Sequence, residues 1–455
     1  MSRGNLIALL DGPSRWRAGE PAVLLGDQVV RTWAELREAV ARRAGGLRDR
    51  LGVRPGDTVG LFAANSAEYL ELLFATWHAG GVVVPISNRL HPKEAGALLE
   101  ASRARACFVS PSLAGGLAGH APEGCSLVVA GDELERSLAR AEPCEPAGRE
   151  LGDDAWIFFT SGTTGTPKGA RLSHGNLLAM AAAYSADVDS VGPGDRLLHI
   201  GALSHASGLF ALPFIARGAE QVLPLSGGFD GHELVSLIAA GERSTFFLPP
   251  TLLRRFTAAP GADSVAARIG TVIVGAAPVR AEELRDGIAV LGPRLWNGYG
   301  QGESPCTITA LGRDAMAAAL RDGDEQRLVS VGVARWATRV RVVGGDDSEL
   351  PAGQMGEVVV DGPTVMAGYL DQPDATAETL RGGWLHTGDI GCFDSDGYLT
   401  LVDRSKDVVI SGGYNVYPRE VEDVLLADPG VVDAAVLGVP DEEWGERVVA
   451  FVVPA

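Results

Sequence analysis

Apolar residues in the first quarter of the chain alternate between continuous hydrophobic runs and stretches with helical spacing. Thr32-Trp-Ala-Glu35 has the spacing of a capping box, and leucine and valine then recur at helical intervals until Gly52. Further helices are expected at 66–78 and 92–101, and short strands at 58–62, 82–85 and 106–109. Strands and helices that alternate at this length predict a parallel sheet covered by helices on both faces.

The same rhythm returns in the middle of the chain, after a poorly patterned connection at 111–152 that holds a short strand at 127–129. Strands are expected at 156–160, 196–200, 221–225, 244–248, 271–274 and 294–296, and helices at 176–184, 209–216, 233–240 and 281–290. We therefore predict a second α/β unit with the rhythm of the first.

From about residue 329 the helical spacing stops, and short strands follow one another. They lie at 340–343, 356–361 and 398–402, between turns rich in Gly, Asp and Pro, which is typical of a small barrel or a curved sheet. A helix at 418–426 and a strand at 432–439 then predict the start of a separate small domain.

A chain of 455 residues exceeds what one hydrophobic core usually supports, so two or more domains are expected. The changes of pattern along the chain place their boundaries. The fold class is α/β. A large N-terminal domain spans 1–402, with two α/β subdomains to about 328 and a β-barrel-like subdomain at 329–402. Residues 403–406 form a hinge, and 407–455 begin a small, incomplete α+β C-terminal domain.

The composition describes a globular protein with 46% apolar and 21% charged residues, and its net charge of −19 argues against a nucleic-acid or anionic-membrane surface. We expect no membrane span, because His and Ser interrupt the apolar run at 197–216. No secretory signal is expected. The five dispersed cysteines indicate reduced thiols in the cytoplasm and no structural metal.

One stretch points to a polyphosphate ligand. Thr160-Ser-Gly-Thr-Thr-Gly-Thr-Pro-Lys-Gly169 joins an apolar strand to a helix for which Ser173 is a suitable N-cap. Glycines let backbone N–H groups approach phosphate oxygens, hydroxyls add donors, and Lys168 supplies charge. The spacing differs from a Walker A loop, because no Ser or Thr follows the lysine. A flexible surface turn is the alternative.

Five other motifs carry candidate chemistry, and each has an ordinary structural alternative. A lone histidine in an apolar run is usually a core residue, small residues after a strand make a tight turn, and Asp after Gly is common turn chemistry. A glycine-spaced turn with an incidental Glu, or a polar linker with a Gly-Gly hairpin, needs no function either. The motifs are His205-Ala-Ser-Gly208, Val274-Gly-Ala-Ala-Pro278, Asn297-Gly-Tyr-Gly-Gln-Gly-Glu303, Trp384-Leu-His-Thr-Gly-Asp389 and the segment from Val402 to Asn415, which includes the linker.

Taken in this order, the motifs resemble those of the superfamily of AMP-forming acyl-CoA synthetases, adenylation domains and luciferases, over nearly the whole chain. That family activates a carboxylic acid as an acyl-adenylate and transfers the acyl group to a thiol. The resemblance implies ATP, Mg²⁺ and coenzyme A as cofactors. It also implies catalytic roles for Lys168, Glu303 and His205, and Mg²⁺ ligation by Glu303 and Thr160.

The resemblance assigns the remaining site residues by motif. Nucleotide contacts are implied for Thr160, Ser161, Gly162, Thr163, Thr164, Gly165, Lys168, Gly275, Ala276, Ala277, Pro278, Asn297, Gly298, Tyr299, Gly300, Gln301, Gly302, Asp389 and Arg404. An acyl pocket is implied for His205, Ala206, Gly208, Leu209, Gly275, Gly300 and Pro305. The hinge and thioester loop correspond to Lys406, Ser411, Gly412, Gly413 and Tyr414.

Two departures from the family pattern bear on the first half-reaction. The family usually carries Thr before the metal-binding Glu, where this chain has Gly302. Loss of that hydroxyl would slow the affected step about ten- to a hundredfold unless Gln301 or a water substitutes. The family's small domain also carries a late lysine, and Lys93, Lys168 and Lys406 stand at other places. Either the chain stops short of the native protein or it lacks this group.

The sequence therefore predicts an AMP-forming acyl-CoA synthetase for a hydrophobic carboxylic acid. Small and apolar residues at 206–210, 275–278 and 305–308 favour a roomy apolar pocket. The alternatives are a ligase that only converts a supplied acyl-adenylate to thioester, an enzyme that loads a carrier protein, and an adenylate binder without catalysis. No carrier domain is visible, which favours a stand-alone ligase. The identity of the acid and the oligomeric state stay open.

Overall fold

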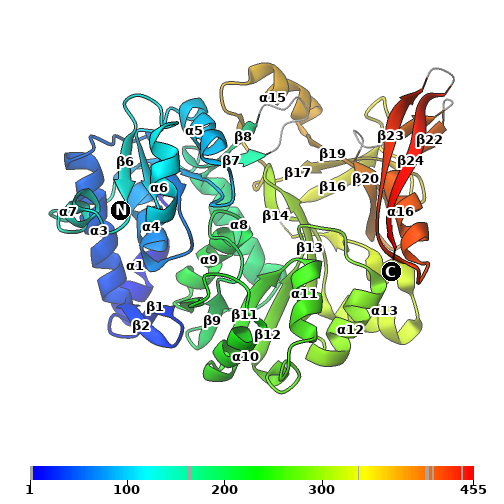
Figure 1. The fold of residues 1–455 in the computed structure, drawn as a ribbon, viewed down its shortest axis with the longest axis horizontal. Coiled ribbons are helices and arrows are strands. Elements are labelled where there is room, and N and C mark those ends of the chain that lie inside the picture. Colours follow the sequence, from blue (N-terminus) through cyan, green and yellow to red (C-terminus); the bar gives the residue numbers. More distant parts are fainter. Residues whose placement is uncertain are drawn as a thin grey trace.

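The computed structural model describes residues 4–160, 167–336, 338–404, 409–411, 414–441 and 444–454. Within these ranges the strands form two large sheets and two small ones (Figure 1). Elements follow the colour gradient from the blue N-terminal part on the left, through the green centre, to the red strands on the right (Figure 1). The α/β class expected from the sequence is confirmed.

The first large sheet has seven strands in the order β18-β8-β7-β4-β3-β5-β6. Its central strands pair in parallel, while β8 pairs antiparallel with both β7 and β18. The strands are β3 (Thr58–Phe62), β4 (Val82–Pro85), β5 (Ala106–Val109), β6 (Ser126–Val129), β7 (Asp154–Thr160), β8 (Lys168–Ser173) and β18 (Gly368–Tyr369). The associated helices are α3 (Trp33–Asp49), α4 (Ala67–Ala79), α5 (Pro92–Ala101), α6 (Pro111–Ala118), α7 (Glu133–Ala139) and α8 (His174–Asp187).

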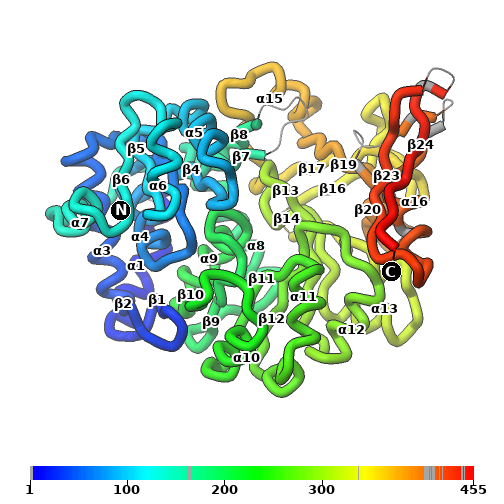
Figure 2. Tube along the Cα trace, in the orientation of Figure 1, coloured from blue at the N-terminus to red at the C-terminus, as the bar shows by residue number. Residues whose placement is uncertain are grey.

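The second large sheet has nine strands in the order β15-β14-β13-β12-β11-β9-β10-β1-β2. The strands are β1 (Pro21–Leu25), β2 (Gln28–Thr32), β9 (Asp195–Leu198), β10 (Glu220–Leu223), β11 (Arg243–Leu248), β12 (Ile269–Val274), β13 (Leu295–Gln301), β14 (Ser304–Leu311) and β15 (Val333–Ala334). The helices are α9 (Ala206–Ala216), α10 (Gly231–Ala240), α11 (Pro250–Thr257), α12 (Ala281–Leu291), α13 (Arg313–Asp322) and α14 (Glu325–Val329). The blue β1–β2 hairpin crosses to this green sheet, where β1 pairs with β10 (Figure 2).

The sheet of the β-rich region corrects one prediction. Its four strands run antiparallel in the order β16-β17-β19-β20, and β16 and β20 form its two open edges, so it is not a closed barrel. The strands are β16 (Arg339–Val343), β17 (Gly356–Asp361), β19 (Leu385–Phe393) and β20 (Leu399–Arg404). The expectation that helices stop here was also wrong, because α15 (Pro373–Thr379) lies between β18 and β19.

The last described residues form a sheet in the order β22-β21-β24-β23, which appears in red at the right of Figure 1. Its elements are β21 (Val409–Ser411), β22 (Tyr414–Val416), α16 (Pro418–Leu426), β23 (Val431–Asp441) and β24 (Gly445–Pro454). The α+β character predicted for this part is confirmed. Several of its large apolar side chains are exposed, including Val424, Trp444 and Phe451.

Helices with a strong periodic pattern were predicted well, whereas strands whose formation depends on pairing with another strand were missed. Thr32 caps α3 through a capping box with Glu35, and Ser173 caps α8 in the same way. In contrast, α6 and α7 occupy the region read as a poorly patterned connection. β8 was missed because Lys168–Ser173 is extended through its pairing with β7 and β18, which no local pattern signals. β14 was missed in the same way, since it pairs with β13.

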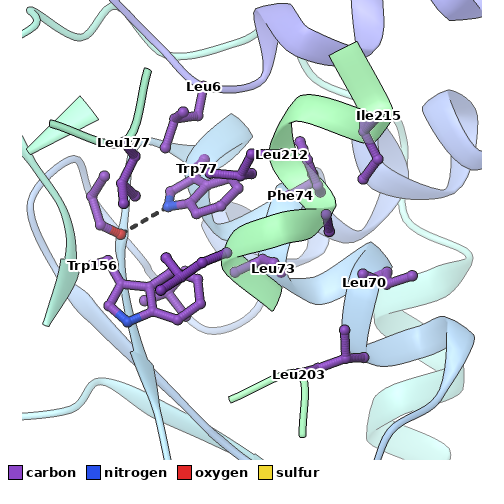
Figure 3. Packing of buried hydrophobic residues seen from close by; sticks show 14 of the residues in the cluster. Leu6, Leu70, Leu73, Phe74, Trp77, Trp156, Leu177, Leu203, Leu212 and Ile215 are labelled. Atoms are coloured by element: carbon purple, nitrogen blue, oxygen red, sulfur yellow. Dashed lines mark hydrogen bonds between the residues drawn. The ribbon is translucent and has the colours of Figure 1, made fainter. Parts of the chain in front are cut away.

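A tryptophan-centred core lies beside the first sheet and ties it to α8 and α9 (Figure 3). The indole N–H of Trp77 donates to the carbonyl of Ala155 at 2.8 Å, which satisfies a polar atom inside an apolar cluster. Trp156 packs next to it at a ring-centroid distance of 6.3 Å. Leu177 from α8 and Leu212 from α9 complete the cluster, so the strand that leads to the glycine-rich loop is anchored through Trp156.

No helix in the described part of the chain has the length and apolar character needed to cross a membrane.

The stability of the fold is expected to depend on pH through three buried histidines. Burial lowers the pKa of His78, His174 and His199 from 6.5 to about 4. Between pH 6.5 and about pH 4 the unfolded chain binds more protons than the folded one. The stability that the neutral histidines allow is therefore complete above pH 6.5 and is lost as the pH falls to about 4. Urea unfolding from pH 7.5 to 4 should therefore show a falling midpoint.

A single variant isolates one of these groups. His174 accepts the Leu6 N–H at 3.2 Å through Nδ1. His174→Asn keeps an acceptor there but removes the titrating ring, so its unfolding free energy should fall less steeply with pH than that of the unchanged chain. Asparagine at the exposed His232 is the matched control. Equal slopes for His174→Asn and the unchanged chain would contradict the assignment.

Candidate active site

The two ends of the glycine-rich loop lie side by side at the tip of the β7–β8 hairpin. Thr160 pairs with Lys168 across the two strands, and the Thr160 hydroxyl lies 3.4 Å from the Lys168 carbonyl oxygen. Ser161, Gly162, Thr163, Thr164 and Gly165 lie outside the described residues. The hairpin nevertheless fixes where the loop starts and ends.

Glu303 meets this hairpin from the other large sheet. It lies in the two-residue turn between β13 and β14, is only 7% exposed, and carries a carboxylate that accepts two hydroxyls on the same oxygen, Oε1. The Thr160 hydroxyl donates at 3.2 Å and the Tyr369 hydroxyl at 2.8 Å. Because Thr160 has one proton to donate, the charged carboxylate is its stronger acceptor.

Tyr369 was not predicted from the sequence, and it connects the acidic and basic sides of this cluster. The Lys168 Nζ lies 5.1 Å from the centroid of its ring, and the Leu370 N–H donates to the Gly169 carbonyl at 2.8 Å. Burial, followed by the negative charge of Glu303, raises the pKa of the Tyr369 phenol. The phenol therefore stays a hydrogen-bond donor at neutral pH.

A second buried carboxylate belongs to Asp389, which is 7% exposed. Its Oδ2 accepts from the Tyr299 hydroxyl and, at 2.9 Å, from the Gln301 amide. Burial first, and then the charge of Asp389, raise the pKa of Tyr299 well above its usual value. Asp389 lies inside β19, opposite Arg404 of β20, and not in a turn, which was the structural alternative for this motif.

The motif from Asn297 to Gln301 forms the end of β13, not a glycine-spaced turn. Its glycines permit close approach to neighbouring chain. A Cβ on Gly300 would lie 2.5 Å from the Cys306 backbone nitrogen, and one on Gly298 would lie 2.2 Å from the Trp296 ring. Asn297 is buried, with its amide 3.4 Å from the Ser330 carbonyl. Gly298 and Gly300 therefore leave no room for a side chain at these two positions.

The segment Gly275–Pro278 follows β12 and offers a small, open surface. A Cβ on Gly275 would lie 2.8 Å from the Gly298 carbonyl, so only glycine fits against the neighbouring strand. Ala276 has a φ of 66°, which is uncommon for a residue with a side chain. The side chains of Ala276, Ala277 and Pro278 are exposed. Their small apolar surface is of the kind against which a flat ring can lie.

His205 directly precedes α9, and its side chain is exposed. Its ring meets Phe158 edge-to-face, with 5.6 Å between centroids, and its Nδ1 lies 2.8 Å from the Ser204 hydroxyl. Desolvation by surrounding atoms, followed by the positive charge of Arg89, lowers the pKa of His205. The uncharged imidazole is therefore favoured.

The other residues predicted for the acyl pocket are mostly buried. Gly208, Leu209 and Pro305 are buried, and Ala206 is partly buried. A Cβ on Gly208 would lie 2.0 Å from the Leu203 carbonyl oxygen, so this glycine allows a tight turn into α9. That steric need is a structural reason for glycine here.

The hinge and thioester loop are only partly described. Ser411 pairs with Tyr414 at the end of the β21–β22 hairpin. Lys406, Gly412 and Gly413 lie outside the described residues.

Sequence reasoning also missed the aromatic residues that line the site. Phe158 lies in β7, two residues before the start of the glycine-rich loop, and Phe247 ends 3.6 Å from a Cβ placed on Gly275. Their hydrophobicity identified them as strand residues and gave no sign of which face they occupy. Arg89, whose charge reaches His205, lies in a turn without a motif.

Taken together, the described residues bring two buried carboxylates, one lysine and an aromatic group to the meeting point of three sheets. Glu303 and Lys168 form one part of the site, Asp389 forms a second part, and Phe158 with His205 forms a third part. Such a site can hold a polyanion, a polar flat molecule and an apolar body at once.

A sequence profile described as AMP-binding enzyme matches residues 13–370, and one described as AMP-binding enzyme C-terminal domain matches 420–455. Feruloyl-CoA synthase of Amycolatopsis sp is 40% identical over 430 residues, which cover 93% of this chain and 84% of that protein. The fatty acid–[acyl-carrier-protein] ligase ScoC of Streptomyces coeruleorubidus is 33% identical, covering 96% of this chain and 84% of the relative. The crystal structure of ATP-bound MatB from Rhodopseudomonas palustris superimposes with a TM-score of 0.87 at 30% identity, covering 99% and 89% of the two chains.

The hydrogen bond between Tyr299 and Asp389 should be measurable as a pairwise coupling. Tyr299→Phe removes one donor from a buried carboxylate and should lower the unfolding free energy by about 1–3 kcal/mol. In the Asp389→Asn background the same change should cost at least about 0.5 kcal/mol less, because the charge that strengthened the bond is gone. Urea unfolding of the four proteins measures this. Strict additivity would show that the two side chains do not interact in solution.

Proposed function

The chain belongs to the family of AMP-binding enzymes and is an AMP-forming acid–CoA ligase, and we propose that its acid is hydrophobic and flat, with an aromatic body. Its substrates are a carboxylic acid, ATP and CoA. The observation that carries the proposal is the edge-to-face contact of Phe158 with His205, close to the Thr160–Glu303 pair. Phe247 adds a further ring beside Gly275. Aromatic side chains favour an acid with a flat apolar body over an acid whose body carries a further charge.

The roles of the nucleotide residues are part of the proposal. The exposed small side chains of Ala276 to Pro278 provide a surface for adenine, and the Asp389 carboxylate accepts hydroxyls of the ribose. Asp389 is already oriented by Tyr299 and Gln301, so it needs little reorganisation when the sugar binds. The 160–168 loop receives the pyrophosphate, with Lys168 supplying positive charge.

In the first half-reaction, a carboxylate oxygen of the acid attacks the α-phosphorus of ATP in line, and the bond from that phosphorus to the bridging oxygen breaks. The pyrophosphate leaves with the electron pair, and an acyl-adenylate forms. The site offers donors and charge without a nucleophilic side chain, which agrees with catalysis by positioning and electrostatic stabilisation. The uncharged His205 borders the acid and adds no competing positive charge.

Mg²⁺ fits the residues present at the turn of β13 and β14. Glu303 supplies a carboxylate and Thr160 a hydroxyl, and both are oxygen ligands of the kind that this ion prefers. No group of three His, Cys, Asp or Glu side chains suited to a metal occurs in the described ranges. A single carboxylate is enough, because Mg²⁺ at phosphates usually takes one or two. When bound, the ion would neutralise charge on the phosphates.

In the second half-reaction, the thiol of CoA attacks the acyl carbonyl and AMP leaves. We propose that the division at 402, the hinge at 403–406 and the small domain from 407 serve this step, with Lys406 as pivot. Ser411 and Tyr414, with the two glycines between them, would form the loop that enters the site. A cytoplasmic location, in which CoA and ATP are both present, is also proposed; the five cysteines are free.

A carrier-protein thiol is the second candidate acceptor. It is favoured by the similarity to ScoC, which is named as a ligase for an acyl carrier protein. Both acceptors attack the same carbonyl, so the first half-reaction would be unchanged. Supplying either CoA or a phosphopantetheinylated carrier protein separates the two.

The proposed activity predicts AMP formation from ATP only when acid and CoA are both present. Aryl acids such as ferulate should give a higher kcat/KM than fatty acids of equal carbon number, because the aromatic side chains match a flat substrate. Chromatography of nucleotides and mass spectrometry of the thioester measure this. ADP in place of AMP would refute the mechanism, and preference for the fatty acid would refute the substrate class.

Glu303→Gln tests the first half-reaction directly. The amide keeps the size of the side chain but loses the charge, so acid-dependent pyrophosphate exchange should slow about ten- to a hundredfold. Glu349→Gln, an exposed glutamate in the β-rich region, is the matched control and should exchange at the normal rate. If the unchanged chain forms thioester from a synthetic acyl-adenylate but shows no exchange, the narrower thioester-only function applies.

A further inference from the structure

The glycine at position 302 is not required by its backbone. Glycines with a φ in the left-handed region include Gly292, Gly323 and Gly332, and Gly302 is not among them. A residue with a side chain could therefore adopt its conformation without strain. The reason for glycine in this turn has to lie in the space around it.

That space is already filled by two side chains from β7. A Cβ built on Gly302 would lie 2.6 Å from Cδ1 of Phe158 and 2.7 Å from Cγ2 of Thr160. Contacts below 3.0 Å require one of the groups to move. No side chain fits at 302 while both neighbours keep their positions.

Neither neighbour moves without consequence. The Phe158 ring packs edge-to-face on His205, with 5.6 Å between centroids and an interplanar angle of 87°. The Thr160 methyl points toward Gly302, while its hydroxyl reaches Glu303 at 3.2 Å. A side chain at 302 would thus push Thr160 away from the carboxylate or turn Phe158 away from the histidine.

We propose that Phe158 is a positioning residue, whose ring takes the place of a side chain at 302 and holds Thr160 in hydrogen-bonding position on Glu303. The inference rests on the proposed function, in which Thr160 and Glu303 border the phosphates. Phe158 acts through Thr160 and does not itself meet the phosphates. On this account Gly302 does not weaken the site, because the ring of Phe158 fills the space that a side chain at 302 would occupy.

The test is a cycle of three variants. Gly302→Thr should lower kcat of acid-dependent pyrophosphate exchange about ten- to a hundredfold, because displacing reacting groups by about 1 Å can cost a hundredfold. Its kcat should fall by a larger factor than its KM for the acid rises, because the main effect is on Thr160 and Glu303. Phe158→Leu alone should lower kcat several-fold. Phe158→Leu combined with Gly302→Thr should recover at least about tenfold over Gly302→Thr, since the shorter side chain removes one of the two clashes and leaves space into which the turn can shift away from the Thr160 methyl.

Two matched controls separate this effect from the substitutions as such. A Cβ on Gly312, the N-cap of α13, meets no atom within 4 Å, so Gly312→Thr should leave kcat unchanged. Phe229→Leu shortens a partly buried phenylalanine that packs against the hydrophobic core of the second large sheet and is not among the nearest neighbours of a Cβ at Gly302, so it should not rescue Gly302→Thr.

Two results would overturn the proposal: normal exchange by Gly302→Thr, or a double variant no faster than Gly302→Thr. Exchange that fails in the unchanged chain would instead reject the adenylation step of the proposed function. In that case, thermal unfolding of the variants tests whether Phe158 and Gly302 are matched in size. A midpoint that falls in Gly302→Thr and returns in the double variant supports the pairing, and one that does not return rejects it.

Discussion

The carboxylate of Glu303 is the constraint on which the site depends. It is buried, and a buried charge without hydrogen-bond donors is costly. Its two donors, Thr160 and Tyr369, lie 143 and 66 residues away in the chain and belong to different strands of the other large sheet. Satisfying this one carboxylate therefore requires that the β13–β14 turn, the β7–β8 hairpin and the short strand β18 meet. The ends of the glycine-rich loop are fixed as a result.

Asp389 places the third sheet by the same principle. Its side chain lies in β19 and accepts from Tyr299 and Gln301, which belong to β13. Glu303 follows Gln301 by only two residues, so one strand end carries the contacts of both carboxylates. The β-rich sheet is thereby oriented relative to the hairpin that bears the loop. A ligand that spans the two carboxylates would contact groups from three sheets, and its binding would report on their arrangement.

Much of this arrangement follows from local patterns, and the rest does not. The capping box at Thr32 and the order of the motifs identified α3 and the segments that form the site, because both signals reside in neighbouring residues. Tyr369 carried no such signal, since its role comes from the pairing of β18 with β8. The barrel expectation failed for a related reason: strand content does not reveal whether the edges of a sheet close. Long-range pairing was the missing information.

Gly302 shows why a departure from a motif has to be judged together with its neighbours. Considered alone, a glycine in place of threonine removes a hydroxyl and weakens the site. In the structure, the ring of Phe158 and the methyl of Thr160 fill the same space, so the absent side chain leaves no gap. The absent hydroxyl removes a donor to the ligand, whereas the absent side chain lets Phe158 and Thr160 keep their positions. Because that hydroxyl contacts Glu303, the sign of the net effect depends on Phe158, a residue outside the motif.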